Sequence, residues 1–264
     1  MNIGLFGAGN MGGALLEAII KTGKHSIAVF DPSEEAKKHF ADRTGVKFTL
    51  SSEEAAAGRN LIIIAVKPNI VPGLINTIAP VIRDSQTVIL SVAAGVKTRV
   101  YTDALGAGFP IVRAMPNLPA LAGEGYTGLY YKNADHIPND IKSAITEIFS
   151  EVGETAEFAA EDYIDKLIPV TSSSPAYICM LIEAMADGAV RLGFTRAEAY
   201  RMCEQAVLGT AAYLKETGMH PAELKDRVCS PAGTTIEAVA ALEEKGFRAA
   251  ILDAMDKCLG KLAK

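Results

Sequence analysis

Two stretches near opposite ends of the chain combine residue types that bind anions. The first, Gly7–Gly12, reads G-A-G-N-M-G, follows an apolar run and opens a helical pattern. In that context G-x-G-x-x-G indicates a dinucleotide site. Gly7 permits a tight turn, Gly9 lets a pyrophosphate approach the backbone, and Gly12 lets helix and strand pack closely. The alternative, a glycine-rich turn that binds nothing, is less favoured here because both flanking elements match the motif.

The second stretch is Ser230–Ile236, with the sequence S-P-A-G-T-T-I. Thr234 stands three residues before Glu237, and an apolar periodic run follows, so the pattern predicts a helix that begins with a capping box. The small residues ahead of it leave backbone N–H groups open to a small anion, and Thr235 adds a hydroxyl. The spacing therefore predicts a small acid at this end and a dinucleotide at the other.

Asp31 ends the second predicted strand, about 20 residues past the glycines, where an acid accepts from the ribose hydroxyls of the cofactor. A carboxylate there repels a 2′-phosphate, which favours NAD(H). Ser33, Lys37 and Lys38 lie close by in sequence and could still receive a phosphate. The alternative is that Asp31 caps a helix that begins at Pro32. Both interpretations stay open.

Two more loops follow strand ends, where ligands bind in this kind of sheet. Lys67, between Val66 and Pro68, is a candidate for the ribose or phosphate edge of the cofactor; the alternative is a surface lysine before a turn. The loop Ala114–Ala120 holds Asn117 between two prolines and could wall the nicotinamide and substrate, or serve as an inert connector. No Ser-His-Asp set, carboxylate pair or Cys-His pair stands out, which suits a protein whose cofactor brings the hydride.

The elements that must position these residues alternate between strand and helix in the first part of the chain. A doubly wound parallel sheet of the Rossmann-like α/β class follows from that order. The predicted strands are Met1–Phe6, Ser26–Phe30, Leu61–Val66, Thr87–Val92, Pro110–Arg113 and Gly128–Tyr131, and the first helices cover Met11–Thr22 and Ser33–Thr44.

Beyond Tyr163 nearly every segment has helical periodicity, and Thr195 with Glu198 forms a further capping box. The predicted helices are Ala176–Leu192, Thr195–Lys215, Pro221–Val228, Thr235–Glu244 and Phe247–Leu262. We therefore divide the chain into a dinucleotide-binding domain, 1–158, and an all-helical substrate-binding and dimerisation domain, 159–264. The first of these helices is apolar almost all round, so it must be buried. A homodimer would bury it; the alternative is packing against the first domain of the same chain.

The composition narrows the class of protein. Of 264 residues, 49% are hydrophobic and 22% charged, which is typical of a soluble globular protein. A net charge of −5 argues against a nucleic-acid partner. The four cysteines form no C-x-x-C pair and the four histidines are scattered, so we expect no metal. The first strand begins at Met1 and no apolar run is uninterrupted over a membrane span, so we expect a cytoplasmic protein without a membrane partner.

Six segments taken together resemble one enzyme family, the pyrroline-5-carboxylate reductases, in order and over nearly the whole chain. The segments are Phe6–Gly12, Ala65–Pro68, Arg113–Asn117, Ser173–Tyr177, Glu183–Asp187 and Cys229–Thr235. Several of them are specific to this family rather than to Rossmann-like proteins in general. The resemblance implies an enzyme that reduces the imine of 1-pyrroline-5-carboxylate to L-proline with NADPH or NADH, the last step of proline biosynthesis.

The resemblance also implies site residues and partners. Members are typically dimers through the helical domain, and some form rings of dimers. The implied substrate-binding residues are Ser230, Ala232, Gly233, Thr234 and Thr235, of which Thr235 bonds the ring nitrogen and is the candidate catalytic residue. The predicted cofactor-binding residues are Gly7, Ala8, Gly9, Asn10, Met11, Asp31, Ser52, Ala65, Val66, Lys67, Pro68, Ala93, Met115, Pro116 and Asn117.

Three positions depart from the family pattern. Ala232 and Ser172 stand where a glycine is common, and an alanine at position 232 would be strained if the backbone there needs a positive φ. Asp31 stands where many members tolerate the 2′-phosphate, so the family default of NADP(H) competes with the NAD(H) that Asp31 favours. Two other functions are less favoured. A β-hydroxyacid reductase would carry a lysine on the helix Ala176–Leu192, and a non-enzymatic regulator would have lost Thr235.

Overall fold

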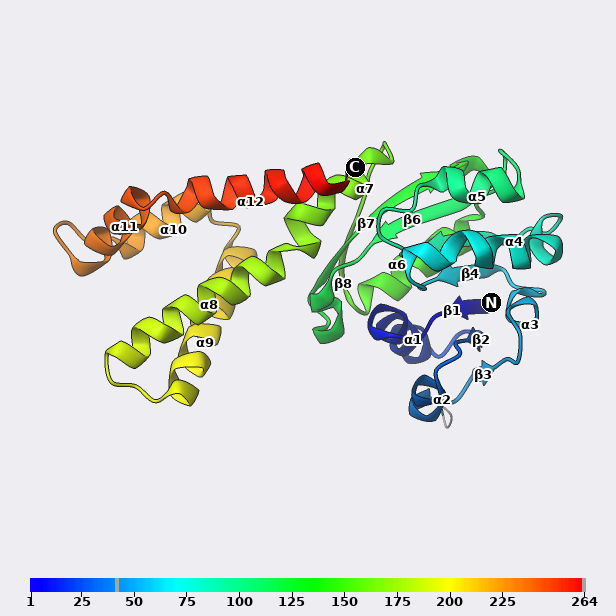
Figure 1. Ribbon diagram of the computed structural model, residues 1–264, viewed down its shortest axis with the longest axis horizontal. Coiled ribbons are helices and arrows are strands. Elements are labelled where there is room, and N and C mark those ends of the chain that lie inside the picture. Colours follow the sequence, from blue (N-terminus) through cyan, green and yellow to red (C-terminus); the bar gives the residue numbers. More distant parts are fainter. Residues whose placement is uncertain (41–42, 263–264) are drawn as a thin grey trace. The chain divides into compact units, whose positions relative to one another are not determined.

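A computed structural model describes residues 1–40 and 43–262 of the protein. The chain forms two compact units, Met1–Ser172 and Ser173–Lys264, each of which is treated separately below (Figure 1). The first is an α/β unit built on one sheet, and the second is all helical. This confirms the predicted fold class.

The sheet has eight strands in the order β3-β2-β1-β4-β5-β6-β7-β8. All neighbouring pairs are parallel except β6 and β7, which are antiparallel. The strands are β1 Asn2–Phe6, β2 Ser26–Phe30, β3 Val46–Phe48, β4 Leu61–Ile64, β5 Val88–Ser91, β6 Ile111–Met115, β7 Gly125–Lys132 and β8 Gly153–Glu157. The six parallel strands therefore share one carboxyl edge, and the chain order reverses between β1 and β4, where ligands bind in such sheets.

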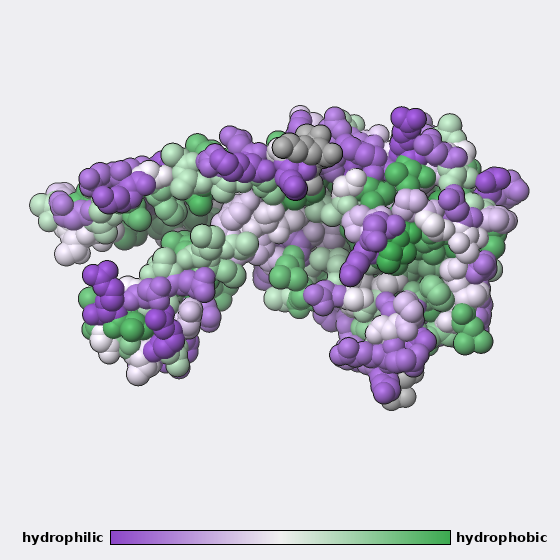
Figure 2. Space-filling model, viewed as in Figure 1, coloured by the Kyte–Doolittle hydropathy of each residue, from purple (hydrophilic) through white to green (hydrophobic). Residues whose placement is uncertain are grey.

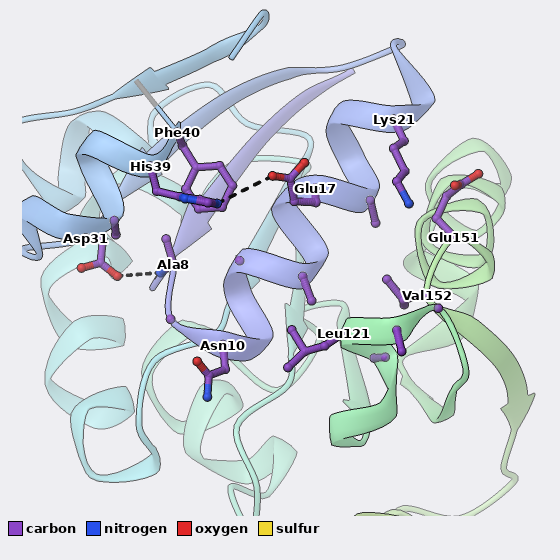
Figure 3. Close-up of a pocket in the computed structure, with 18 of the residues that line it drawn as sticks. Ala8, Asn10, Glu17, Lys21, Asp31, His39, Phe40, Leu121, Glu151 and Val152 are labelled. Carbon is purple, nitrogen blue, oxygen red and sulfur yellow. Dashed lines mark hydrogen bonds and ion pairs between the residues drawn. The ribbon is translucent and has the colours of Figure 1, made fainter. Parts of the chain in front are cut away.

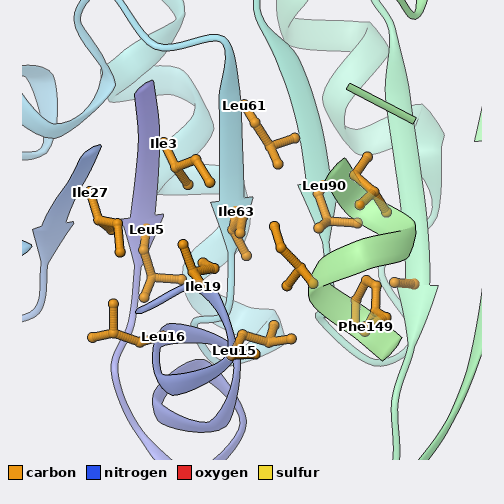
Figure 4. Packing of buried hydrophobic residues seen from close by; sticks show 14 of the residues in the cluster. Ile3, Leu5, Leu15, Leu16, Ile19, Ile27, Leu61, Ile63, Leu90 and Phe149 are labelled. Atoms are coloured by element: carbon orange, nitrogen blue, oxygen red, sulfur yellow. The ribbon is translucent and has the colours of Figure 1, made fainter. Parts of the chain in front are cut away.

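Both faces of the sheet are covered, which is why the central strands are apolar on both sides. On one face Leu5 and Ile63 pack with Leu15 and Ile19 of helix α1 and Phe149 of helix α6 (Figure 4). The opposite face packs against α3, α4 and α5. The helices of this unit are α1 Asn10–Thr22, α2 Glu34–Phe40, α3 Ser52–Ala56, α4 Val71–Ile82, α5 Thr98–Leu105, α6 Asn139–Ser150 and α7 Asp162–Leu167, with 3₁₀ turns η1 Pro68–Ile70, η2 Leu118–Ala122 and η3 Ala134–His136.

The two short outer strands were not among the predicted ones. β3 has three residues and β8 reads G-E-T-A-E, so neither carries the run of β-branched or aromatic residues that marks a strand in sequence. The predicted helix over Ser33–Thr44 is observed as α2, which is shorter; residues 41 and 42 lie outside the described residues.

The compact units divide later than the predicted boundary at residue 158. Helix α7 lies beyond that boundary, yet Ile164 and Leu167 are buried with Met115 of the sheet in a small apolar cluster. The π-helical turn η4 (Ile168–Ser172) follows α7 and completes the first unit. These contacts keep α7 on the sheet, although its sequence is helical like everything that follows.

The second unit consists of α8 Ser174–Arg191, α9 Arg196–Thr217, α10 Pro221–Val228, α11 Thr234–Glu244 and α12 Phe247–Leu262. The capping box of Thr195 and Glu198 is confirmed at the start of α9. Among the residues of this unit that the structure describes, only a small apolar cluster around Ala186, Ala199 and Cys203 is buried. Many large apolar side chains are exposed instead, among them Met180 at 69% and Leu208 at 60%, and Figure 2 shows apolar residues at the surface of this unit.

One helical segment of the described residues is long and apolar enough to cross a membrane. It runs from Asp162 to Arg191, through α7, η4 and α8, and only 11% of its most apolar window is buried. Such an exposed apolar surface needs a partner of some kind.

Candidate functional site

The loop between β1 and α1 has the geometry that a dinucleotide requires. Gly7 has φ +90°, and a Cβ there would lie 2.7 Å from the Ala65 carbonyl oxygen. A Cβ on Gly12 would lie 2.0 Å from the Gly7 oxygen, so both positions accept only glycine. Gly9 differs, because nothing lies within 4 Å of the position that its Cβ would take. The open side of Gly9, at the free N-terminus of a 13-residue helix, is therefore a cradle for an anionic group.

Asp31 is fixed beside this loop by two backbone donors. The Ala8 N–H donates to Oδ2 at 2.6 Å (Figure 3). The Ser33 N–H donates to Oδ1 at 2.7 Å. Helix α2 begins at Glu34, and the Ser33 hydroxyl accepts from the Ala36 N–H. The alternative in which Asp31 caps a helix that begins at Pro32 is therefore wrong, because the helix begins at Glu34 and Ser33 is in the N-cap position. Asp31 instead ties the end of β2 to the glycine loop.

Asp31 also lines an open cavity of about 730 Å³. Gly9 and Asn10 form its floor at the start of α1, and Figure 3 shows it continuing along α1 past Glu17 toward Lys21. His39 and Glu151 stand on opposite sides of it. The cavity thus begins at the predicted cofactor loop, and its wall combines small and apolar residues with charged side chains such as Glu17, Lys21 and Asp31.

The other predicted cofactor residues also follow strands at the carboxyl edge. Ala65 packs against the glycine loop, Lys67 is exposed just after β4, and Pro68 opens η1. Ala93 is buried after β5. Ser52 is buried at the start of α3, and its hydroxyl donates to the Glu53 carboxylate at 2.9 Å, so that hydroxyl is engaged within the protein.

The residues Met115–Asn117, where β6 ends, are buried, whereas Leu118 directly after them is 53% exposed. Met115 packs into the cluster with α7, Pro116 is buried, and both polar atoms of the Asn117 side chain bond to backbone groups. We expected these residues to line the nicotinamide. In the structure their side chains pack behind this edge of the sheet, and their contact with the cofactor stays a prediction.

An ion-pair network around the buried Arg113 lies next to that loop and was missed in the sequence. Arg113 is 1% exposed; its guanidinium pairs with Glu161 at 3.2 Å and with Asp165, which Lys97 also contacts at 2.7 Å. Although burial acts to raise it, hydrogen bonds from Arg113 and Lys97 hold the pKa of the Asp165 carboxyl below its ordinary value. An arginine inside an apolar strand is the signal that could have found this network, because a buried charge needs a partner.

The segment Ser230–Thr235 lies in the second unit as a tight turn followed by a helix. The Gly233 N–H donates to the Ser230 carbonyl at 3.0 Å, and a Cβ on Gly233 would lie 2.2 Å from the Ser230 hydroxyl. Gly233 is the N-cap of α11 and Thr234 is already helical, so the predicted capping box with Glu237 is wrong. Thr235, the second residue of α11, lines an apolar cavity of about 670 Å³ within this unit.

Ala232 has a positive φ of +55°, a backbone conformation that favours the glycine common at this position. With Pro231 before it, the turn Ser230–Gly233 has the features of type II. We expect Ala232→Gly to leave the free energy of unfolding unchanged or to raise it by up to about 1 kcal/mol, because relief of left-handed strain offsets the extra freedom of the unfolded chain. Ala211→Gly, on the exposed face of α9, should cost about 1 kcal/mol. Urea unfolding of the two variants compares these effects. An equal loss of unfolding free energy in both would contradict strain at Ala232.

The matches to known proteins extend over the whole chain. A curated pyrroline-5-carboxylate reductase from Escherichia coli K12 is 44% identical over 265 residues, which is 99% of this chain and 97% of that protein. The chain belongs to the pyrroline-5-carboxylate reductase family. The family's dimerisation model matches residues 161–264, and a model described as NADP oxidoreductase, coenzyme F420-dependent, matches residues 2–95.

Solved members of the family have the same fold. A pyrroline-5-carboxylate reductase from Coxiella burnetii superposes with a TM-score of 0.91 at 30% identity, over 99% of this chain and 97% of that one. The Plasmodium falciparum enzyme, solved with NADP bound, superposes with a TM-score of 0.85 at 26% identity, over 99% and 97%. The family's dimerisation region thus coincides with α7 and the helical unit, where the exposed apolar surface lies.

Proposed function

We propose that the protein reduces 1-pyrroline-5-carboxylate to L-proline with a nicotinamide dinucleotide, the last step of proline biosynthesis. The observation that carries this function is 44% identity to a reductase of that name over 99% of the chain. The test is oxidation of NADPH and of NADH by the purified protein with and without pyrroline carboxylate. Oxidation that does not depend on the imine would contradict the function.

The first unit offers a site that fits the cofactor. Gly9 leaves open space above the N-terminus of α1, whose free N–H groups suit a pyrophosphate, and Asp31 presents a carboxylate at the neighbouring strand end. When bound, the cofactor supplies the hydride. The chain's own contribution is to hold it by the glycine loop and by the backbone after β4, around Ala65–Pro68.

We infer a preference for NADH from the local charges. Two backbone N–H groups hold the Asp31 carboxylate at the end of β2, where a 2′-phosphate would meet its negative charge. Of the two nearby lysines, Lys37 is already paired with Glu34 at 2.7 Å. This favours NAD(H) over the NADP(H) that is the family default.

The imino acid is assigned to the second unit. Its carboxylate suits the N–H groups at the start of α11, next to the Ser230 hydroxyl, because the positive end of an 11-residue helix lies there. Ala232, Gly233 and Thr234 give the turn its shape. The Thr235 hydroxyl would bond the ring nitrogen and help to keep it protonated, and a protonated imine accepts hydride most readily. Thr235 is therefore our candidate catalytic residue.

We further infer that a second copy of the chain, not a bilayer, covers the exposed apolar face of the helical unit. The apolar segment through α8 carries Glu183, Asp187 and Arg191, which would be costly inside a bilayer. The match to the family's dimerisation model supports the same reading. A cytoplasmic protein without membrane or nucleic-acid partners remains our expectation, and the family resemblance allows dimers to assemble further into rings.

The dimer should be sensitive to charge on that face. We expect the native protein to have twice the mass of one chain by light scattering, and Met180→Glu with Leu208→Glu to shift it to monomer or aggregate, since burying unpaired carboxylates is costly. Glu216→Arg, at the exposed end of α9, is the control that should stay dimeric. A native protein with the mass of one chain would contradict the interface.

A further inference from the structure

Tyr101 carries a hydroxyl that is sealed inside the first unit. It lies on α5 and belongs to the apolar cluster on the sheet face opposite α1, where its side chain is fully buried. Removal from water raises the pKa of its phenol to about 12, so the hydroxyl stays protonated near neutral pH. A buried tyrosine hydroxyl needs a hydrogen-bond partner, and the identity of that partner indicates a role for Tyr101.

The partner is the hydroxyl of Ser91, the last residue of β5. The two hydroxyls share a hydrogen bond, and both side chains are fully buried. Ser91 Oγ also accepts from the Ala93 N–H at 3.3 Å, just beyond the strand end. A serine hydroxyl by itself can turn among three staggered positions, and the bond to Tyr101 selects the one that faces Ala93. Ser91 thus connects helix α5 to the backbone that follows β5.

Ala93 is the first residue of a tight turn at the carboxyl edge of the sheet. The Val96 N–H donates to the Ala93 carbonyl at 3.3 Å, and Gly95 has φ +73° at the position where a type II turn needs it. Ala93 is buried, whereas Ala94 and Gly95 are exposed at the tip. The turn therefore presents its backbone at the edge, while Ser91 holds its first residue from inside the unit.

This turn stands on the side of the sheet that is left for the nicotinamide half of the cofactor. The glycine loop follows β1 and Asp31 follows β2, so the pyrophosphate and the adenosine ribose are assigned to those two strand ends. In the sheet order, β4 and β5 lie on the other side of β1 from β2. A dinucleotide across the carboxyl edge would therefore extend its nicotinamide half toward the turn at Ala93.

We propose that Tyr101 is a positioning residue for the nicotinamide half of the cofactor, which acts by holding Ser91 and, through it, the turn at Ala93. The inference rests on the proposed function, because it takes the cofactor to be a nicotinamide dinucleotide. Without the phenol hydroxyl, Ser91 is free to rotate and the turn loses a fixed contact. Binding of the nicotinamide half would then carry the cost of ordering that turn, whereas binding of the adenosine half would not.

The test is Tyr101→Phe, which removes one oxygen and keeps the ring. We expect the Kd for NADH, measured by calorimetry, to rise by about 3- to 10-fold, the scale of one net hydrogen bond. The Kd for ADP, which lacks the nicotinamide half, should change by less than about 2-fold, as for a distant change. Ser91→Ala should show the same combination. The double variant should raise the Kd for NADH no further than the larger single effect, because the two hydroxyls act together.

Tyr131→Phe is the matched control. Burial also raises the pKa of the Tyr131 phenol to about 12, but this residue lies on β7 and packs against the α1 face of the sheet. Its loss of the hydroxyl should keep both Kd values within about 2-fold of wild type.

Three outcomes would overturn the inference. The first is an NADH affinity in Tyr101→Phe equal to that in Tyr131→Phe. The second is an equal loss of affinity for NADH and ADP, which would mean a general disturbance of the edge. The third is an unchanged NADH affinity in Ser91→Ala, which decides the matter if Tyr101→Phe does not fold. A wild-type protein that binds NADH without reducing the imine would refute the proposed function alone, and one that binds neither nicotinamide would refute both.

Discussion

Thr235→Ala should lower kcat/KM for pyrroline carboxylate by about 10- to 1,000-fold, the range that positioned proton donors and charge-stabilising groups contribute. Thr235 lines the apolar cavity of the helical unit beside the N-terminus of α11, so its hydroxyl stands next to the N–H groups that suit the substrate carboxylate. The Kd for the cofactor should not change, because the cofactor residues lie in the first unit. Steady-state kinetics with both nicotinamides, together with calorimetry, gives both quantities.

Two further variants make this result specific. Thr235→Ser keeps the hydroxyl and should retain activity to within about 10-fold of wild type. Thr217→Ala removes a hydroxyl that donates to the Tyr213 carbonyl at the end of α9, and should leave kcat/KM unchanged. If Thr235→Ala were as active as Thr217→Ala, the role of Thr235 at the ring nitrogen would be wrong.

Asp31→Asn should raise kcat/KM for NADPH relative to NADH by about 10-fold or more. The carboxylate stands at the end of β2, where a 2′-phosphate would meet it, and a charge pair at a protein surface is worth a few kcal/mol at close range. Asparagine has the same shape and removes the charge, but it keeps only one of the two acceptors that Asp31 offers to the Ala8 and Ser33 N–H groups. Wild type should favour NADH.

Glu35→Gln is the control for Asp31→Asn. It removes a carboxylate from the same cavity without touching the end of β2, so it should leave the NADPH to NADH ratio within about 2-fold of wild type. Rising salt should narrow the wild-type preference, since it screens exposed charges. A wild-type enzyme that prefers NADPH, with a ratio that Asp31→Asn leaves unchanged, would refute discrimination by Asp31.

Local patterns were sufficient for most of the first unit. The segments that form β1, β2 and β4 are apolar and bounded by turn residues. The glycine spacing predicts a close approach of the backbone, and in the structure a side chain at position 7 or 12 would clash with neighbouring backbone atoms. The capping box at Thr195 was equally readable, because both partners lie within one turn. The similar pattern at Thr234 gave a wrong prediction of a capping box. The turn before it makes Gly233 the N-cap, so the helix begins one residue earlier, at Thr234.

By itself, the sequence determined the fold class, the order of the two units and the family, because these depend on periodicity and on short motifs whose residues are neighbours in the chain. Only the tertiary structure decided what Asp31, Arg113 and Asn117 contact. Each of the three has at least one partner 23 to 54 residues away, and no local pattern encodes such a pairing. Burial then makes each pairing obligatory, since a buried polar group without a partner costs about 1–3 kcal/mol. The same burial joined α7 to the sheet, although its sequence is that of the helical unit.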